Sequence, residues 1–101
     1  MSTNSLKFLE KLTGGPLTFS KMLKAIRLSD EVSQVELANN IGVSRGLICD
    51  IEKGRRFPTF EQANNIANYL GYSPQGFIAI LIQDQLREVN LPMKVTLEKA
   101  S

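Results

Sequence analysis

The feature that most constrains the fold of this chain is a pair of short helical patterns separated by a glycine, within residues 33–56. Ser33 can cap the first helix, and Glu36 lies at the spacing of a capping box. The apolar residues of this helix share one face: Leu37, Ala38 and Ile41. Gly42 follows, where helices commonly end in a left-handed residue. One capped, amphipathic helix is therefore predicted here.

A second helix is predicted immediately after this glycine. Ser44 is its expected N-cap, and Gly54 marks its expected end. Its inward residues recur at helical spacing: Leu47, Ile48 and Ile51. Two helices joined over so short a turn cross at a steep angle, and the small residues Ala38 and Gly42 leave room for the crossing. The stretch therefore predicts two helices joined by a tight turn.

The second helix is predicted to turn a polar face outward, because Ile48 and Ile51 point inward. The outward positions are Arg45, Gly46, Cys49, Asp50 and Lys53. The N-terminal half of such a helix is the part that enters a DNA major groove. At its far end Lys53, Arg55 and Arg56 are suited to phosphate contact, although cations there also compensate the helix dipole. Double-stranded DNA is the predicted partner.

Length and composition are those of one globular domain. The chain has 101 residues, 43% of them hydrophobic, so one modest core is expected. The net charge is only +2, so the argument for nucleic acid rests on the local cations of residues 45–56. The chain shows neither a signal-peptide pattern nor the roughly 20 apolar residues of a membrane span. We expect a cytoplasmic protein without membrane contact, associated with the nucleoid when bound to DNA.

Catalysis is the least favoured class of function. The chain has no histidine, no cluster of metal ligands and no glycine-rich phosphate loop, so no metal, cofactor or catalytic residue is predicted. The single cysteine, Cys49, excludes an internal disulfide. As a small helix residue near the DNA face, it is better explained by its position than as a redox switch.

Further helices are predicted on both sides of this unit. Caps and apolar spacing place them at residues 5–12, 18–28, 59–70 and 74–89. The last helix carries more apolar surface than one buried face needs, so a homodimer interface is predicted there. Its residues are Phe77, Ile78, Leu81 and Ile82. Burial under the N-terminal helix is the monomeric alternative, whereas two-fold pairing would set two reading helices roughly 34 Å apart.

Residues 93–98 alternate apolar and polar side chains, which is the pattern of a strand. A lone strand leaves its backbone groups unpaired. We therefore expect it to pair in trans, with its symmetry mate or with an edge strand of another protein. A tail without fixed structure is the alternative.

These spaced residues together resemble the Cro/phage-repressor (lambda-repressor-like, XRE) helix-turn-helix family. The positions that carry the resemblance are Gln34, Leu37, Ala38, Gly42, Val43, Ser44, Ile48, Ile51, Glu52, Gly54, Arg55, Pro58, Ala67, Leu70 and Gly71. The resemblance implies an all-α, five-helix DNA-binding domain, here residues 18–88, whose third helix reads the groove. It does not cover the ends, where we expect an N-terminal arm or short helix (1–17) and a tail or strand (89–101).

The resemblance also implies roles for single positions. Those expected to face base edges are Ser44, Arg45, Gly46 and Asp50, with Arg45 as the main reader of guanine. Those expected to contact phosphates are Gln34, Lys53, Arg55 and Arg56, and Gln34 also braces the reading helix. Arg27 and Glu52 correspond to a buried ion pair. Asp50 is tolerable near DNA if it binds cytosine or is held by Arg45 or Lys53.

Two departures from the family pattern concern backbone freedom. Gly46 puts no side chain where a base reader is common, which would permit a close approach to DNA or lower the specificity. Glu31 replaces a frequent glycine, so the first turn of the domain is expected to differ.

The predicted function is repression by a homodimer bound to an inverted-repeat operator. An antitoxin on the same fold, which regulates its own operon and masks a small toxin-like partner, is a close variant. An adaptor that binds proteins and not DNA is the alternative from another class. Salt distinguishes them, because DNA affinity falls steeply with salt when cations neutralise phosphates.

Overall fold

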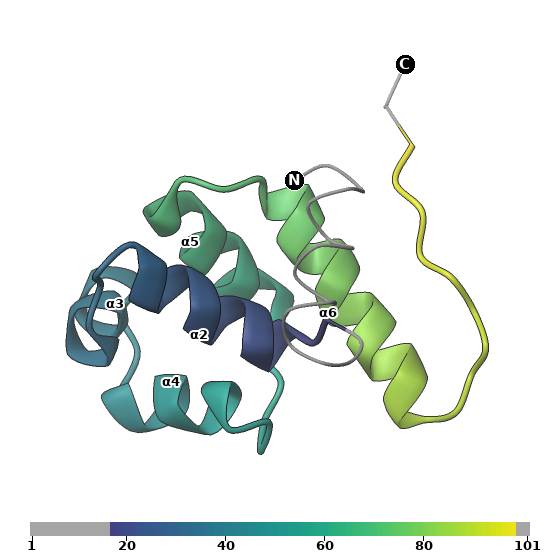
Figure 1. Ribbon diagram of the computed structural model, residues 1–101, viewed down its shortest axis with the longest axis horizontal. Helices are drawn as coiled ribbons and strands as arrows, with labels where there is room; N and C mark the ends of the chain where they lie inside the picture. Colours follow the sequence, from purple (N-terminus) through teal and green to yellow (C-terminus); the bar gives the residue numbers. More distant parts are fainter. Residues whose placement is uncertain (1–16, 99–101) are drawn as a thin grey trace.

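The computed structural model describes residues 17–98, which form five α-helices and no strand (Figure 1). The helices are α2 (Phe19–Ser29), α3 (Gln34–Ile41), α4 (Arg45–Glu52), α5 (Phe60–Leu70) and α6 (Pro74–Glu88). The prediction of an all-α, five-helix body is confirmed. The short helix expected at residues 5–12 lies outside the described residues.

Each helix of the described part begins at a serine or threonine, as the sequence predicts. The side chains of Thr18, Ser33, Ser44, Thr59 and Ser73 each accept a hydrogen bond from a backbone amide of the first turn. These amides have no partner within their own helix, so each cap satisfies a group that would otherwise need water.

The capping box predicted for α3 forms only in part. Ser33 accepts a hydrogen bond from the Glu36 amide at 3.0 Å, but the Glu36 carboxylate accepts one from the Tyr69 hydroxyl of α5 at 2.7 Å. A complete capping box joins Thr59 and Gln62 at the start of α5. A tertiary partner has therefore replaced the local one, and Glu36 ties α3 to α5.

All five of these helices end at one residue in the left-handed conformation. The residues are Glu31, Gly42, Gly54, Gly71 and Asn90, with φ between 58° and 82°. After each of them, the next backbone amide returns to the carbonyl five residues earlier at 2.9–3.0 Å. This is the Schellman arrangement, which satisfies carbonyls at the helix end. The sequence predicts the three glycines as helix ends but not Glu31, where the left-handed conformation costs about 1–2 kcal/mol.

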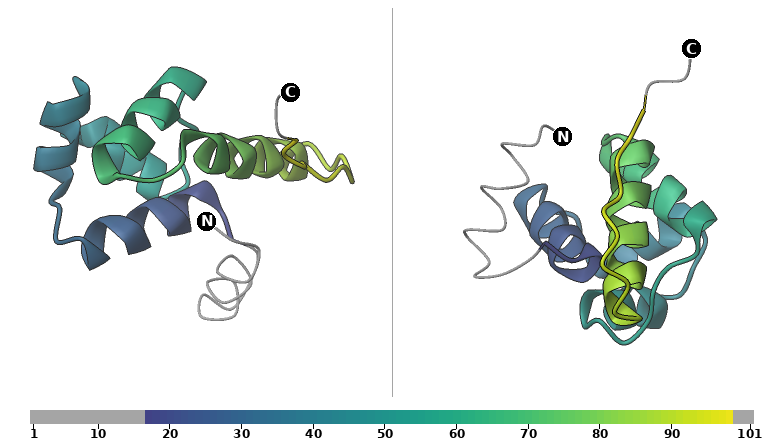
Figure 2. Two further views of the ribbon diagram at one scale, coloured as in Figure 1. Left: turned by 90° about the horizontal axis from the view of Figure 1, so that it is seen from above. Right: turned by 90° about the vertical axis from the view of Figure 1, so that its right-hand side faces the viewer.

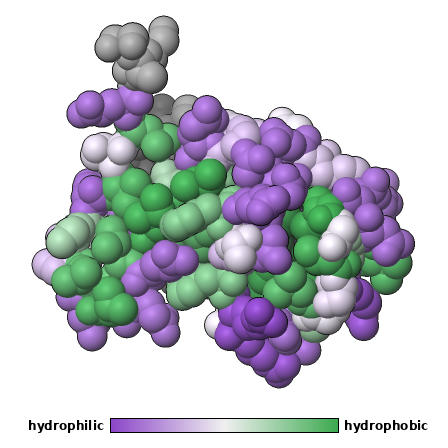
Figure 3. Space-filling model, turned by 180° about the vertical axis from the view of Figure 1, so that it is seen from behind, coloured by the Kyte–Doolittle hydropathy of each residue, from purple (hydrophilic) through white to green (hydrophobic). Residues whose placement is uncertain are grey.

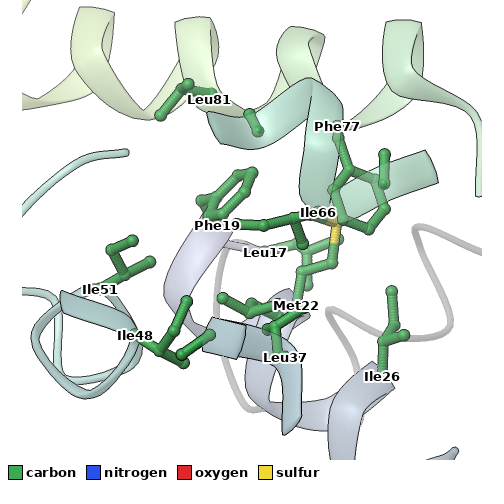
Figure 4. Packing of buried hydrophobic residues seen from close by; sticks show 14 residues of the cluster. Leu17, Phe19, Met22, Ile26, Leu37, Ile48, Ile51, Ile66, Phe77 and Leu81 are labelled. Carbon is green, nitrogen blue, oxygen red and sulfur yellow. The ribbon is translucent and has the colours of Figure 1, made fainter. Parts of the chain in front are cut away.

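The core lies where α2 packs against α4 and α6, and α5 packs against α3 and α6. Phe19 and Phe77 meet edge to face, with ring centroids 5.8 Å apart and planes at 89° (Figure 4). Ile48 and Ile51 are 0% and 1% exposed and belong to this cluster. The inward orientation of these two isoleucines, on which the DNA face depends, is confirmed.

The helix α6 contributes more to the core than the sequence suggests. Phe77 and Leu81 are 2% and 0% exposed within the single chain. Of the four residues expected at a dimer interface, only Ile78 and Ile82 therefore remain partly exposed. The apolar excess of α6 is explained in part by this domain's own core.

Residues 91–98 form an extended tail that runs back along α6 (Figures 1 and 2). The strand predicted at residues 93–98 is not formed within the described part of the single chain. Instead, the Gln83 carboxamide of α6 donates a hydrogen bond to the Met93 carbonyl at 2.8 Å and accepts one from the Val95 amide at 2.9 Å. A side chain thus takes the place of a neighbouring strand.

Candidate nucleic-acid interface

The N-terminal end of α4 is open to solvent. Ser44, Arg45 and Gly46 are all exposed. The Ser44 Oγ accepts a hydrogen bond from the Leu47 amide at 3.1 Å, and its hydroxyl hydrogen remains available to a phosphate or a base. Arg45 makes no ion pair within residues 17–98, so its guanidinium can meet a ligand without breaking one.

Gly46 lies in the first turn of α4 with open space beside it. A Cβ atom at this position would meet only Ser44 Oγ, at the ordinary contact distance of 3.8 Å. Packing of the domain therefore does not require glycine here. What the missing side chain provides is a bare stretch of backbone at the surface.

Asp50 is held by a residue other than the two expected. Its carboxylate lies 3.7 Å from Arg55 Nη1, and the two side chains are 37% and 66% exposed. The sequence prediction named Arg45 or Lys53 as its partner, and the turn after α4 brings Arg55 there instead. A pair this exposed contributes roughly 0–1 kcal/mol, so Arg55 can exchange Asp50 for a phosphate.

Three cations are gathered at the C-terminal end of α4. Lys53, Arg55 and Arg56 are all exposed there, around Gly54, which has a φ of 74°. This conformation turns the chain sharply after the helix and is easy only for glycine. The structure thus brings together three of the four residues that the sequence predicts as phosphate contacts.

A buried ion pair fixes the end of α4 to α2. Arg27 Nε donates to Glu52 Oε2 at 2.6 Å, and Arg27 Nη2 donates to Glu52 Oε1 at 2.9 Å. The side chains are 9% and 3% exposed. Arg27 Nη1 also donates to the Val32 carbonyl at 2.9 Å. The hydrogen bond to Glu52 raises the pKa of Arg27, against the lowering effect of burial, so the guanidinium stays charged.

Gln34 joins this ion pair from the start of α3. Its Nε2 donates to Glu52 Oε1 at 3.1 Å, so one carboxylate holds side chains from α2 and α3 at the end of α4. The side chain of Gln34 is therefore placed to brace α4, and it is only partly buried. Its other N–H can still reach an acceptor outside the protein.

A buried acid beside the candidate site that the sequence analysis does not single out is Asp84. Its buried carboxylate accepts a hydrogen bond from the Phe19 amide at the start of α2 and one from Arg87, both at 2.7 Å. It lines a cavity of about 280 Å³ between α2, α6 and the loop after α4. An acid on the same helix face as Phe77 and Leu81 is the signal that could have found it.

Two other site types find no support in the described residues. Between residues 17 and 98 no three His, Cys, Asp or Glu side chains are grouped as they would be around a metal ion. No helix of that part is both long and apolar enough to cross a membrane.

Comparison with known proteins agrees with this geometry. Residues 23–77 match a helix-turn-helix family model, HTH_3. The chain is 30% identical over 76 residues to the immunity repressor protein of Bacillus phage phi105, covering 73% of this chain and 53% of that protein. It is 31% identical over 77 residues to the cryptic phage CTXphi transcriptional repressor RstR of Vibrio cholerae, covering 76% of this chain and 64% of that protein.

The chain thus spans between about half and two thirds of the length of these two relatives. The family match includes all of α3, the turn at Gly42, and all of α4 and α5. It contains the inward isoleucines and the exposed end of α4 whose geometry is described above. This chain therefore belongs to the HTH_3 helix-turn-helix family, of the Cro and phage-repressor type.

Proposed function

We propose that this chain is a transcriptional repressor that binds double-stranded DNA by inserting the start of α4 into the major groove. The observation that carries the proposal is the exposed N-terminal end of α4 on a helix whose other end is fixed by the Arg27–Glu52 ion pair. A rigidly held helix with a free N-terminal end is suited to groove reading. The names of the two relatives, both repressors, support the direction of regulation.

Base reading is assigned to the first turns of α4. Arg45 can donate two hydrogen bonds to guanine, a contact that contributes about 1–3 kcal/mol of discrimination. Asp50 can accept a hydrogen bond from cytosine once Arg55 has moved to a phosphate. Ser44 and Gly46 complete the surface, the first as a hydroxyl and the second as bare backbone.

Phosphate contact is assigned to the two ends of the unit. Lys53, Arg55 and Arg56 form the cationic end, and Gln34 lies at the start of α3. Such contacts fix the protein on the duplex without reading its sequence. They also make the affinity depend on salt, because each neutralised phosphate releases counterions.

The repressor is proposed to act as a homodimer on an inverted repeat. A two-fold pair of domains matches a two-fold pair of half-sites, whose centres would lie roughly 34 Å apart. Ile78 and Ile82 of α6 are partly exposed, which supports pairing through this helix.

The test compares two arginine variants on a DNA fragment protected in a footprint. Arg45→Ala is expected to weaken binding to that site selectively, whereas Arg56→Ala is expected to weaken all sequences and to lower the salt slope by about one. Lys24→Ala, which removes an exposed cation of α2, is the matched control and should change little. If both arginine variants bind every duplex as the unmodified protein does, the proposed face is wrong.

A further inference from the structure

Within residues 17–98, the tail beyond α6 is held by hydrogen bonds along one edge. Gln83 hydrogen-bonds to the Met93 carbonyl and the Val95 amide, which lie on either side of Lys94. In an extended chain these two groups point to the same side, and the amide and carbonyl of Lys94 point to the other. These two hydrogen bonds, called the Gln83 clamp below, leave a second edge of the tail open. That edge is formed by the backbone groups of residues 94, 96 and 98, which face away from Gln83.

Apolar side chains in the tail and just before it are exposed to solvent. Met93 and Leu97 are 56% and 61% exposed, and Val89 and Leu91 before them are 62% and 43% exposed. Seen from behind, the side of the molecule formed by α6 and the tail is largely hydrophobic (Figure 3). An extended segment with an open edge and exposed apolar residues is a template for pairing with another strand.

The sequence of the tail is complementary to itself. From Lys94 to Glu98 it runs cation, apolar, threonine, apolar, anion. When two copies pair antiparallel about Thr96, each Lys94 lies opposite a Glu98 and each Val95 lies opposite a Leu97. Opposite charges, two threonines and two aliphatic side chains are all favourable cross-strand pairs.

The hydrogen-bonding pattern agrees with this register. Pairing about Thr96 makes residues 94, 96 and 98 the hydrogen-bonded positions of the ladder. These are the residues whose backbone groups the Gln83 clamp leaves open. A register centred on Lys94 would set residue 96 against Pro92, which has no amide hydrogen to donate.

We propose that the tail pairs with the tail of a second copy of this chain, as an antiparallel two-stranded ribbon centred on Thr96. The occupant is a second copy because the segment carries opposite charges at its two ends and is therefore complementary to itself when two copies run antiparallel. This inference rests on the homodimer in the proposed function and names the contact that forms it. The tail lies on the far side of α6 from α4, so pairing leaves both reading helices exposed (Figures 1 and 2).

Charge reversal tests the register in the full chain without DNA. Lys94→Glu places two carboxylates opposite each other at both ends of the ribbon, and Glu98→Lys does the same with two cations. Each is expected to raise the dimer dissociation constant about tenfold in sedimentation experiments. The double variant Lys94→Glu/Glu98→Lys restores both pairs and the unchanged net charge, so its dissociation constant should return to that of the unmodified chain.

Mixing the two single variants provides the sharpest readout. One variant then carries carboxylates at both positions and the other carries cations, so the mixture should form heterodimers more tightly than either variant forms homodimers. Lys24→Glu makes the same charge change on α2 and should leave the dissociation constant unchanged. Thr96→Pro removes the central amide donor and should yield monomers.

Several results would overturn the pairing. They are an unmodified chain that sediments as a monomer at all concentrations, a Thr96→Pro variant that stays dimeric, and single charge variants that the reversal does not rescue. Capture of the tail by a strand of a different protein, with no self-association, would also overturn it. Binding of the Thr96→Pro variant to a single half-site distinguishes failure of tail pairing from failure of the proposed function. A monomeric Thr96→Pro variant with an intact α4 should still bind that DNA.

Discussion

For Gly46, in the first turn of α4, the effect on folding stability can be separated from the effect on DNA binding. Its helical backbone does not need glycine, and a Cβ atom there would meet only Ser44 Oγ at 3.8 Å. Gly46→Ala is therefore expected to raise the free energy of unfolding by up to about 0.8–1.0 kcal/mol. If the bare backbone approaches DNA, the same methyl group should weaken binding. Chemical denaturation and DNA titration measure the two effects.

Gly42→Ala is the control for this residue-scale argument. Space around Gly42 is also open, but its φ of 73° is unfavourable for alanine. The variant should lower the free energy of unfolding by about 1–2 kcal/mol, so the two glycines should respond with opposite signs. A loss of stability in Gly46→Ala would contradict the assignment of that glycine to ligand contact.

At the scale of elements, Asp84 joins the end of α6 to the start of α2. Asp84→Ala would leave the buried Phe19 amide without its acceptor, which should lower the free energy of unfolding by about 1–3 kcal/mol. Loss of the ion pair with Arg87, whose side chain is exposed, should add little to this decrease. Asp84→Asn keeps an acceptor oxygen and removes the charge, so it should cost clearly less in urea denaturation. An equal loss in both variants would mean that charge, and not the hydrogen bond, is what α2 needs.

Helix starts and most helix ends are predictable from this sequence because their causes are local. Ser44 and Gly42 act within one turn of their own positions, and the apolar spacing of α4 is read within eight residues. The partners of Glu36 and Asp84 are different, since Tyr69 lies 33 residues away and Phe19 lies 65 residues away. Contacts between elements distant in the chain leave no local pattern, so the tie from α3 to α5 and the cap on α2 become visible only in the fold.

The same limit applies to surfaces. The apolar residues of α6 predict an excess of buried area but do not say which of them serve the domain's own core. Phe77 and Leu81 do, because α2 and α5 reach them. In the same way, a basic side chain near α4 is predictable, whereas the pairing of Arg55 with Asp50 depends on the turn at Gly54.

At the scale of the whole molecule, one buried carboxylate ties α4 to two other helices. Glu52 at the end of α4 binds Arg27 of α2 and Gln34 of α3, so three helices meet at a single charged group. The helix α4 is fixed in two ways: its isoleucines hold one face in the core, and the ion pair holds its C-terminal end. The exposed N-terminal end can then meet DNA without ordering the helix first, which lowers the entropic cost of binding.

Glu52→Leu tests this coupling. The substitution keeps much of the side-chain volume but leaves Arg27 charged, buried and unpaired, so the free energy of unfolding should fall by about 3–5 kcal/mol in urea denaturation. Adding Arg27→Met removes the stranded charge, and the double variant should regain most of that stability. It lacks the tie to Gln34, however, so its DNA affinity should stay below that of the unmodified chain. Full recovery of both stability and affinity would show that the three-helix junction serves folding alone and leaves the placement of α4 to the apolar core.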